Sequence, residues 1–424
     1  MLFLKPRHRL AWTFALLPLL AMAEGEALSP GRPITLAQAV ARSQASNPDL
    51  AVAGYALRVQ DGLSLQAGLA PNPELGITVE DALGTGDRSG FSSAQTTLSL
   101  RQIIERGAAA RRVAASQAGR DLLDAEQVEK QLDVAAETAR RYIRVLSDQL
   151  RLDLAGEGLR LAEQAVAAAK ERVDAARAPD AEFSRAQVDL ARAELDREDI
   201  EHELLTSRRQ LAALWGDADA NFGTAAGNLA RLPDLKPFEA LASQLKANPS
   251  LLKFGSETRL RLAELRLAEQ RRKPAWEVSA GVRRYEAGND VAGVFGLSIP
   301  LSWRDQGQGT IAAAQARVEQ VDASRTASEL RMRTHLFELF QELQHARHVA
   351  DTLDGRMLPR ATESLKQTEY AYARGRYSYL ELVAAQRDLL AVKRARIQAA
   401  VDAHGYATEI DRLTGTVPGS AESQ

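Results

Sequence analysis

Two histidines and two glutamates are spaced so that one helix face could hold a divalent cation. His335, Glu338, Glu342 and His345 follow one another at intervals of three and four residues, with His348 close by. Such intervals place side chains on one arc of an α-helix, and imidazole and carboxylate groups are zinc ligands. A solvated or interhelical polar face explains the same spacing more simply. The metal site is therefore a hypothesis that competes with an ordinary helix surface.

No other residue pattern in the chain predicts catalysis. The sequence has no glycine-rich phosphate loop and no cofactor motif, and its serines, histidines and aspartates lack a signature spacing. It has no cysteine, which excludes disulfides, thiolate metal sites, a cysteine nucleophile and a lipid-modified cysteine. We therefore expect neither an enzyme nor a bound cofactor.

The composition favours long helices over a thick globular core. The 424 residues carry a formal net charge of −2, and aromatic residues make up only 5% of them. Stretches rich in Ala, Leu, Arg, Glu and Gln are typical of extended helices. The small net charge does not indicate a nucleic-acid surface, and we expect no nucleic-acid partner.

The first 23 residues have the pattern of an export signal. Three basic side chains precede a short apolar run, and Ala21-Met22-Ala23 matches the cleavage rule for small residues. A membrane anchor is the alternative, but the run is shorter than the roughly 20 residues that span a bilayer. We expect residues 1–23 to be removed after export. No later stretch predicts a membrane-spanning helix, so any return to a membrane would use strands.

The sequence repeats its pattern at an offset of about 200 residues. Asn47-Pro48 recurs as Asn248-Pro249, and Leu214-Trp215-Gly216 recurs as Leu413-Thr414-Gly415. Several such matches in the same order predict a tandem duplication. The expected parts are a first repeat over 24–215, a linker over 216–237, a second repeat over 238–415 and a C-terminal tail over 416–424.

Each repeat is expected to contain a helix, a strand hairpin and a long helix pair. The expected hairpins span 73–103 and 275–303, where apolar and polar residues alternate as in strands with one apolar face. The expected helix pairs span 105–215 and 306–415, and each begins with one long helix, over about 105–176 and about 309–374. A helix of ~70 residues is roughly 100 Å long.

The long helices carry narrow apolar seams, which predict helical neighbours. One seam steps by four and three residues through Leu132, Ala136, Ala139, Ile143, Leu146 and Leu150. In the second repeat Leu336, Phe340 and Leu343 share one face. Such thin helix pairs cannot bury their seams alone, so we expect an oligomer.

Four strands are too few to close a membrane barrel. They form either a small soluble sheet or part of a barrel shared by several chains, and three chains would supply twelve strands. Trp276 and Trp303 fall at the same end of one hairpin, as in an aromatic belt at a membrane surface, although they could also cap a soluble sheet. Gly107, Pro300 and Gly307 lie where a strand must pass into a helix.

These features resemble the outer-membrane efflux proteins, the TolC-like channel family. The resemblance is carried by ITLAQAVARSQASNPDL from Ile34, YARGRYSYLELVAAQRDLL from Tyr372 and the doubled plan of hairpins and coiled coils. LSIPLSWRDQGQGTIAAAQARV, from Leu297, is most similar to the cobalt–zinc–cadmium resistance branch. The resemblance implies a mainly α-helical homotrimer with a 12-stranded outer-membrane β-barrel and a periplasmic α-barrel. It further implies a periplasmic adaptor (membrane fusion protein) and an inner-membrane RND pump as partners.

The resemblance also draws attention to the two helix breaks, which would form the periplasmic tip. Glu182 precedes Ala186-Gln187, and Glu381 precedes Ala385-Gln386, at the same spacing. Three chains would bring six glutamates near one axis, where they would attract cations and raise one another's pKa. Arg185 and Ala384 stand where some relatives carry a second acid, which weakens this gate hypothesis. The alternative is an acidic residue that stabilises the start of a helix.

The function predicted from the sequence is export of divalent heavy-metal cations through the outer membrane of a Gram-negative bacterium. The channel would extend into the periplasm and carry no lipid anchor. One alternative is a channel for multidrug efflux or type I protein secretion. An alternative of another class is a periplasmic adaptor or structural coiled-coil protein.

Overall fold

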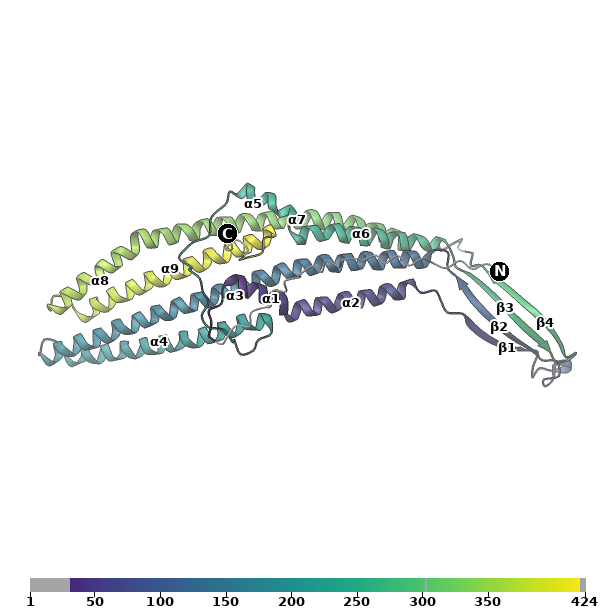
Figure 1. The fold of residues 1–424 in the computed structure, drawn as a ribbon, viewed down its shortest axis with the longest axis horizontal. Coiled ribbons are helices and arrows are strands. Elements are labelled where there is room, and N and C mark those ends of the chain that lie inside the picture. Colours follow the sequence, from purple (N-terminus) through teal and green to yellow (C-terminus); the bar gives the residue numbers. More distant parts are fainter. Residues whose placement is uncertain (1–30, 302, 420–424) are drawn as a thin grey trace, which may run out of the picture.

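The chain is a long, curved molecule with helices over most of its length and one sheet at its end (Figure 1). The computed structural model describes residues 31–301 and 303–419. The expected export signal, 1–23, and the last five residues of the expected tail lie outside the described residues. The predicted fold class, a mainly helical chain with four strands, is confirmed.

The same order of elements recurs in the two halves of the chain. In the first half the helices and strands are α1 (Leu36–Ser46), α2 (Pro48–Gly68), β1 (Glu74–Glu80), β2 (Gln95–Ile104), α3 (Ala108–Asp174) and α4 (Asp180–Ala212). In the second half they are α5 (Phe238–Gln244), α6 (Pro249–Glu269), β3 (Trp276–Tyr285), β4 (Asp290–Ser298), α7 (Gln308–Thr352), α8 (Leu358–Ala373) and α9 (Tyr379–Thr414).

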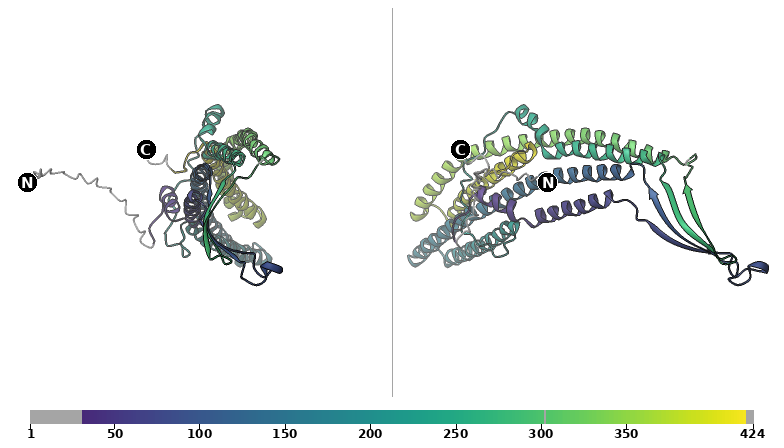
Figure 2. Two further views of the ribbon diagram at one scale, coloured as in Figure 1. Left: turned by 90° about the vertical axis from the view of Figure 1, so that its right-hand side faces the viewer. Right: turned by 45° about the vertical axis from the view of Figure 1, so that its right-hand side comes forward.

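Four strands continue four helices and form one curved wall. The sheet order is β1-β2-β3-β4, with every pair antiparallel. Helices α2, α3, α6 and α7, each joined to one of these strands, lie side by side in the same order (Figures 1 and 2). The wall is therefore open at two edges, one formed by β1 and α2 and the other by β4 and α7.

The sheet has one apolar face and one polar face. Leu75, Leu100, Ala280 and Phe295 are directly paired across the four strands. The neighbouring row, on the opposite face, is Gly76, Ser99, Gly281 and Val294. Among the described residues no helix lies over either face (Figure 1). The apolar side chains are consequently exposed in the single chain, with Phe295 at 83%.

The repeated Asn-Pro pair begins α2 and α6 and ties each of them to a returning helix. The Asn47 side chain accepts the backbone N–H groups of Asp49 and Leu50 and donates to the Leu214 carbonyl oxygen at 2.8 Å. The Asn248 side chain accepts from Ser250 and donates to the carbonyl oxygens of residues 412 and 413. Proline is favourable directly after each asparagine, because the N–H group of the first helical residue has no partner within the helix.

The long helix expected over 309–374 is interrupted, which corrects the prediction. A π-helical turn, Leu353–Met357, separates α7 from α8, and Pro359 follows it. Proline has no N–H to donate and its ring crowds the carbonyl group four residues earlier, so the helix widens before it. The corresponding helix of the first half, α3, runs unbroken for 67 residues.

One hydrophobic core lies near the middle of the molecule, where the segment between α4 and α5 crosses the helices (Figure 1). Ile34, Tyr142, Leu211 and Phe222 pack together there. The Tyr142 hydroxyl donates to the Ile34 carbonyl oxygen at 2.8 Å, which ties α3 to the segment that precedes α1. No helix within 31–301 and 303–419 combines the length and apolar character needed to span a membrane.

Candidate functional site

The α3–α4 and α8–α9 hairpins reverse direction through the same backbone turn. Ala176 and Gly375 adopt left-handed conformations, with φ of +54° and +71°. The next N–H closes each turn: Arg177 donates to the Arg172 carbonyl oxygen at 2.8 Å, and Arg376 donates to the Ala371 carbonyl oxygen at 3.0 Å. These bonds satisfy carbonyl groups that the helix end leaves free.

Glu182 lies between the two hairpins. Its Oε1 accepts the Tyr372 hydroxyl at 2.6 Å and lies 3.7 Å from Nε of Arg172. The Arg172 guanidinium also stacks on the Tyr372 ring, 4.4 Å from its centre. The Glu182 side chain is only 13% exposed. Burial, together with the hydrogen bond to this carboxylate, raises the pKa of Tyr372. Glu182 therefore links α4 to α8.

Glu381 occupies the equivalent position in the second hairpin, but its contacts are local. Its side chain accepts the Ser378 N–H at 2.7 Å, and the Ser378 hydroxyl caps the Glu381 N–H in return. The backbone N–H of Ser378 lowers the pKa of Glu381. The carboxylate is exposed and touches neither the other hairpin nor Glu182 through any hydrogen bond described. Glu381 thus stabilises the start of α9.

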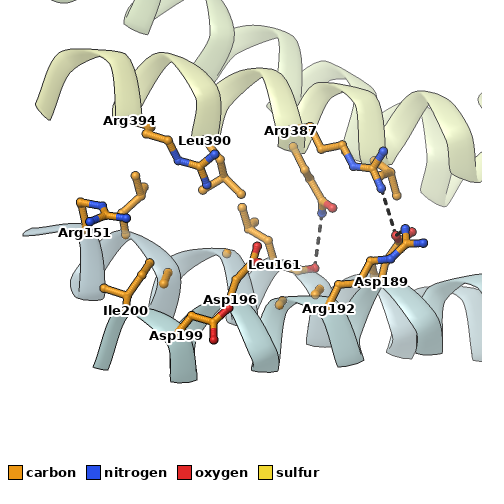
Figure 3. A pocket seen from close by; sticks show the side chains of 18 of the residues that line it. Arg151, Leu161, Asp189, Arg192, Asp196, Asp199, Ile200, Arg387, Leu390 and Arg394 are labelled. Carbon is orange, nitrogen blue, oxygen red and sulfur yellow. Dashed lines mark hydrogen bonds and ion pairs between the residues drawn. The ribbon is translucent and has the colours of Figure 1, made fainter. Parts of the chain in front are cut away.

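A second link between the hairpins was not predicted from the sequence. The buried Tyr379 donates its hydroxyl to Asp189 at 3.1 Å, and Arg387 pairs with the other oxygen of Asp189 at 3.0 Å. Figure 3 shows the Arg387–Asp189 pair at one end of a groove between α3, α4 and α9. The groove has a volume of about 430 Å³ and charged side chains along both rims.

The four residues of the metal-site hypothesis lie on the exposed face of α7. His335 Nδ1 is 3.1 Å from Glu338 Oε2, and the pair is solvent-exposed. Glu342 instead lies near Tyr406 on α9, where burial and the Glu342 carboxylate together raise the pKa of Tyr406. In the described part of the chain, no group of three or more His, Asp or Glu side chains is arranged to hold a metal ion.

The strand-to-helix joints contain the predicted glycines. Gly107 and Gly307 have φ of +84° and +72° and directly precede α3 and α7. Pro300 lies in the longer connection between β4 and α7. The Asp305 carboxylate accepts the Gly307 N–H at 2.8 Å. In the first joint, Arg112 holds Glu105 through two hydrogen bonds of 2.7 and 2.8 Å.

The two tryptophans lie at the end of the sheet next to the helices. Trp276 begins β3 opposite Ile104, and the Arg106 guanidinium lies 4.8 Å from the centre of its ring. Trp303 lies in the connection from β4 to α7 and is 82% exposed. Both lie at the same end of the sheet.

Comparison with known proteins agrees with this architecture. Residues 39–217 match the model of the outer membrane efflux protein family. The cobalt-zinc-cadmium resistance protein CzcC of Cupriavidus metallidurans is 29% identical over 383 residues, which are 90% of each chain. The nickel-cobalt-cadmium resistance protein NccC of Alcaligenes xylosoxydans is 28% identical over 316 residues, 72% of this chain and 70% of NccC.

The fold matches that of solved outer-membrane proteins. The crystal structure of VceC from Vibrio cholerae superposes with a TM-score of 0.70 at 17% identity, covering 90% of this chain and 96% of VceC. The family match, the relatives that align over most of their length and the helix–strand wall lead to one conclusion. Over residues 39–217 the chain is similar to the outer membrane efflux protein family, and the relatives extend this similarity over most of the chain.

Proposed function

We propose that three copies of the chain form an outer-membrane channel of a tripartite RND-type efflux system that exports divalent heavy-metal cations. The observation that carries the channel is the wall of four helix–strand units, which is open at both edges. The choice of metal cations rests on the relatives, which are named for resistance to cobalt, zinc, cadmium and nickel.

The open edges support the proposed trimer. An unpaired strand edge cannot face lipid, because its backbone polar groups would have no partner. Pairing β4 of one copy with β1 of the next would give twelve strands in three copies. The same joining brings α7 beside α2 of the next copy. Both helices have large exposed apolar side chains: Val52, Tyr55, Val59 and Leu63 on α2, and Leu330 and Phe337 on α7.

The two faces of the sheet indicate which side of the wall would contact lipid and which side would line the lumen. The apolar face would contact lipid and the polar face would line an aqueous lumen. Trp276 and Trp303 would then form an aromatic belt at the periplasmic surface of the membrane. The helices would extend into the periplasm, where α3 alone, with 67 residues, is about 100 Å long. The absence of cysteine from the sequence argues against a lipid anchor.

The hairpin tips lie farthest from the sheet, and we assign the gate to them. Glu182 holds α4 to α8 through Tyr372, and Glu381 adds an exposed negative charge at the start of α9. In a trimer these tips would converge at the periplasmic entrance. They would also be the part nearest to an adaptor and an inner-membrane pump. A passive duct needs no catalytic group or cofactor.

A deletion strain tests the proposal. It should become sensitive to zinc, cadmium, cobalt or copper while its growth in drugs and detergents stays unchanged. The chain should fractionate with outer membranes and migrate as a trimer in mild detergent. Sensitivity to drugs alone would keep the channel and overturn the cargo. A protein released from membranes by salt would contradict the channel itself and favour a periplasmic adaptor.

A further inference from the structure

Two rows of charged side chains cross the polar face of the sheet. The inner charged row, next to the helices, consists of Glu74 on β1, Arg101 on β2 and Glu277 on β3. The outer charged row, near the far end of the sheet, consists of Glu80 on β1 and Arg283 on β3. The two rows differ in how their arginines are neutralised.

In the outer charged row the guanidinium makes three hydrogen bonds within the sheet. Arg283 donates from Nε to Thr97 at 2.8 Å, from Nη1 to Gln95 at 3.0 Å and from Nη2 to Glu80 at 2.7 Å. Its side chain is 26% exposed. One carboxylate balances one guanidinium, so this row presents little net charge to the solvent.

In the inner charged row two carboxylates share one guanidinium. Arg101 Nε lies 3.2 Å from Glu277, and its Nη1 lies 3.9 Å from Glu74. All three side chains are more than a third exposed. Each chain therefore carries one excess negative charge here. Because Arg101 lies between the acids, it keeps them from converging on one cation as ligands.

The face between the rows carries short side chains. Gly76, Ser99 and Gly281 are directly paired across three strands. A Cβ atom at Gly281 would lie 2.5 Å from the Leu98 carbonyl oxygen, so no larger residue fits without a backbone shift. The long charged side chains of the two rows are therefore separated by a stretch of short ones.

We propose that the inner charged row determines the charge preference of the channel at its membrane-spanning end. The proposal rests on the trimeric channel proposed above. Three copies would surround the lumen with six carboxylates and three guanidinium groups, an excess of three negative charges. Rings of carboxylates favour cations in channels, and low-dielectric walls strengthen their field. The shared guanidinium makes the ring attractive to cations without holding them.

Reversal potentials in planar lipid bilayers under a KCl gradient test the proposal. Glu277→Gln should lower the permeability ratio of K⁺ to Cl⁻ by about twofold or more, and Arg101→Gln should raise it by a similar factor. Glu74→Gln provides a second variant with the same sign as Glu277→Gln. The matched control is Glu239→Gln, because Glu239 is an exposed glutamate on α5, outside the sheet, in a weak pair with Arg333 at 3.6 Å.

Each variant is measured alone and together with Tyr372→Phe, which removes the hydrogen bond to Glu182 and is expected to reduce the contribution of the hairpin tips to the current. Opposite shifts for Glu277→Gln and Arg101→Gln, with none for Glu239→Gln, would support the proposal. Unchanged ratios in both backgrounds, with normal conductance, would overturn it and leave the channel intact. Failure of the unmodified protein to conduct at all would instead count against the proposed function.

Discussion

The tips of the α3–α4 and α8–α9 hairpins have the same backbone turn and the same glutamate spacing, yet their carboxylates have different surroundings. Glu182 is buried against Tyr372 and Arg172 of other helices, whereas Glu381 is exposed and bonded to its own Ser378. Local hydrogen bonds determine the backbone conformation of each turn, and both turns make these bonds. The surroundings of each carboxylate depend instead on whether another helix packs over it. A neighbouring helix packs over Glu182 but not over Glu381.

The largest expected effect is at the covered tip. Glu182→Ala would leave the Tyr372 hydroxyl and the Arg172 guanidinium without their carboxylate, at a cost of about 3 kcal/mol. We expect a lower temperature of trimer dissociation in detergent and a several-fold higher single-channel conductance. Arg185→Ala, on the same helix turn but in no described link, is the control. Equal conductance for the two variants would show that this link does not restrict the duct.

The second expected effect concerns the far ends of the same hairpins, where Asp411 on α9 occupies the position of Ala212 on α4. Burial raises the pKa of Asp411 to about 6, although Lys236 opposes the shift. A carboxyl with a raised folded pKa contributes stability at low pH, which is lost as the pH rises from about 4 to about 6. Asp411→Asn should remove this dependence and stabilise the protein at pH 7 by about 2 kcal/mol.

Thermal unfolding between pH 4 and pH 7 checks this prediction. The difference between Asp411→Asn and the unmodified protein should grow with pH across that range. Asp402→Asn, which changes a carboxylate on the same helix but in an exposed hydrogen bond with Gln398, is the control. A constant difference across the range would mean that Asp411 does not titrate there.

The third expected effect is seen when the turn residues of the two tips are exchanged. Gly375→Ala should cost about 1 kcal/mol, because a Cβ atom is disfavoured in the left-handed region. Ala176→Gly should be neutral or stabilising by up to about 1 kcal/mol, because it removes that penalty but gains freedom in the unfolded chain. Limited proteolysis at the two turns measures both. Effects of the same sign would mean that the turns are not equivalent.

The smallest structural effect is expected at the exposed tip. Glutamine also completes a capping box, so Glu381→Gln should retain the start of α9 while removing its charge. We expect unchanged trimer stability but a lower preference for cations in bilayer recordings. Unchanged conductance and ion selectivity would exclude Glu381 from the gate. Measuring the Glu182→Ala variant in parallel distinguishes the effect of the Glu381 charge from the effect of opening the link between the hairpins.

Much of the fold could be predicted because its signals are local. Strands β1 and β2 together span residues 74–104, within one residue of the hairpin predicted over 73–103, since alternation and flanking turns are visible within a short window. The seam from Leu132 to Leu146 is buried as predicted. Leu150, expected on the same seam, is 39% exposed, because it lies beside a cavity near the middle of the molecule. The break before Pro359 was not predicted, although a proline within a helical pattern favours such a break.

The candidate site divides in the same way. The sequence by itself determined the positions of the turns, the glutamates after them and the glycines before α3 and α7, because each depends on neighbouring residues. Only the tertiary structure decided that Tyr372 meets Glu182 and that Tyr379 meets Asp189, pairs separated by 190 residues. It also decided which carboxylates share Arg101. Such contacts follow from how hairpins and strands pack, and no short-range periodicity encodes them.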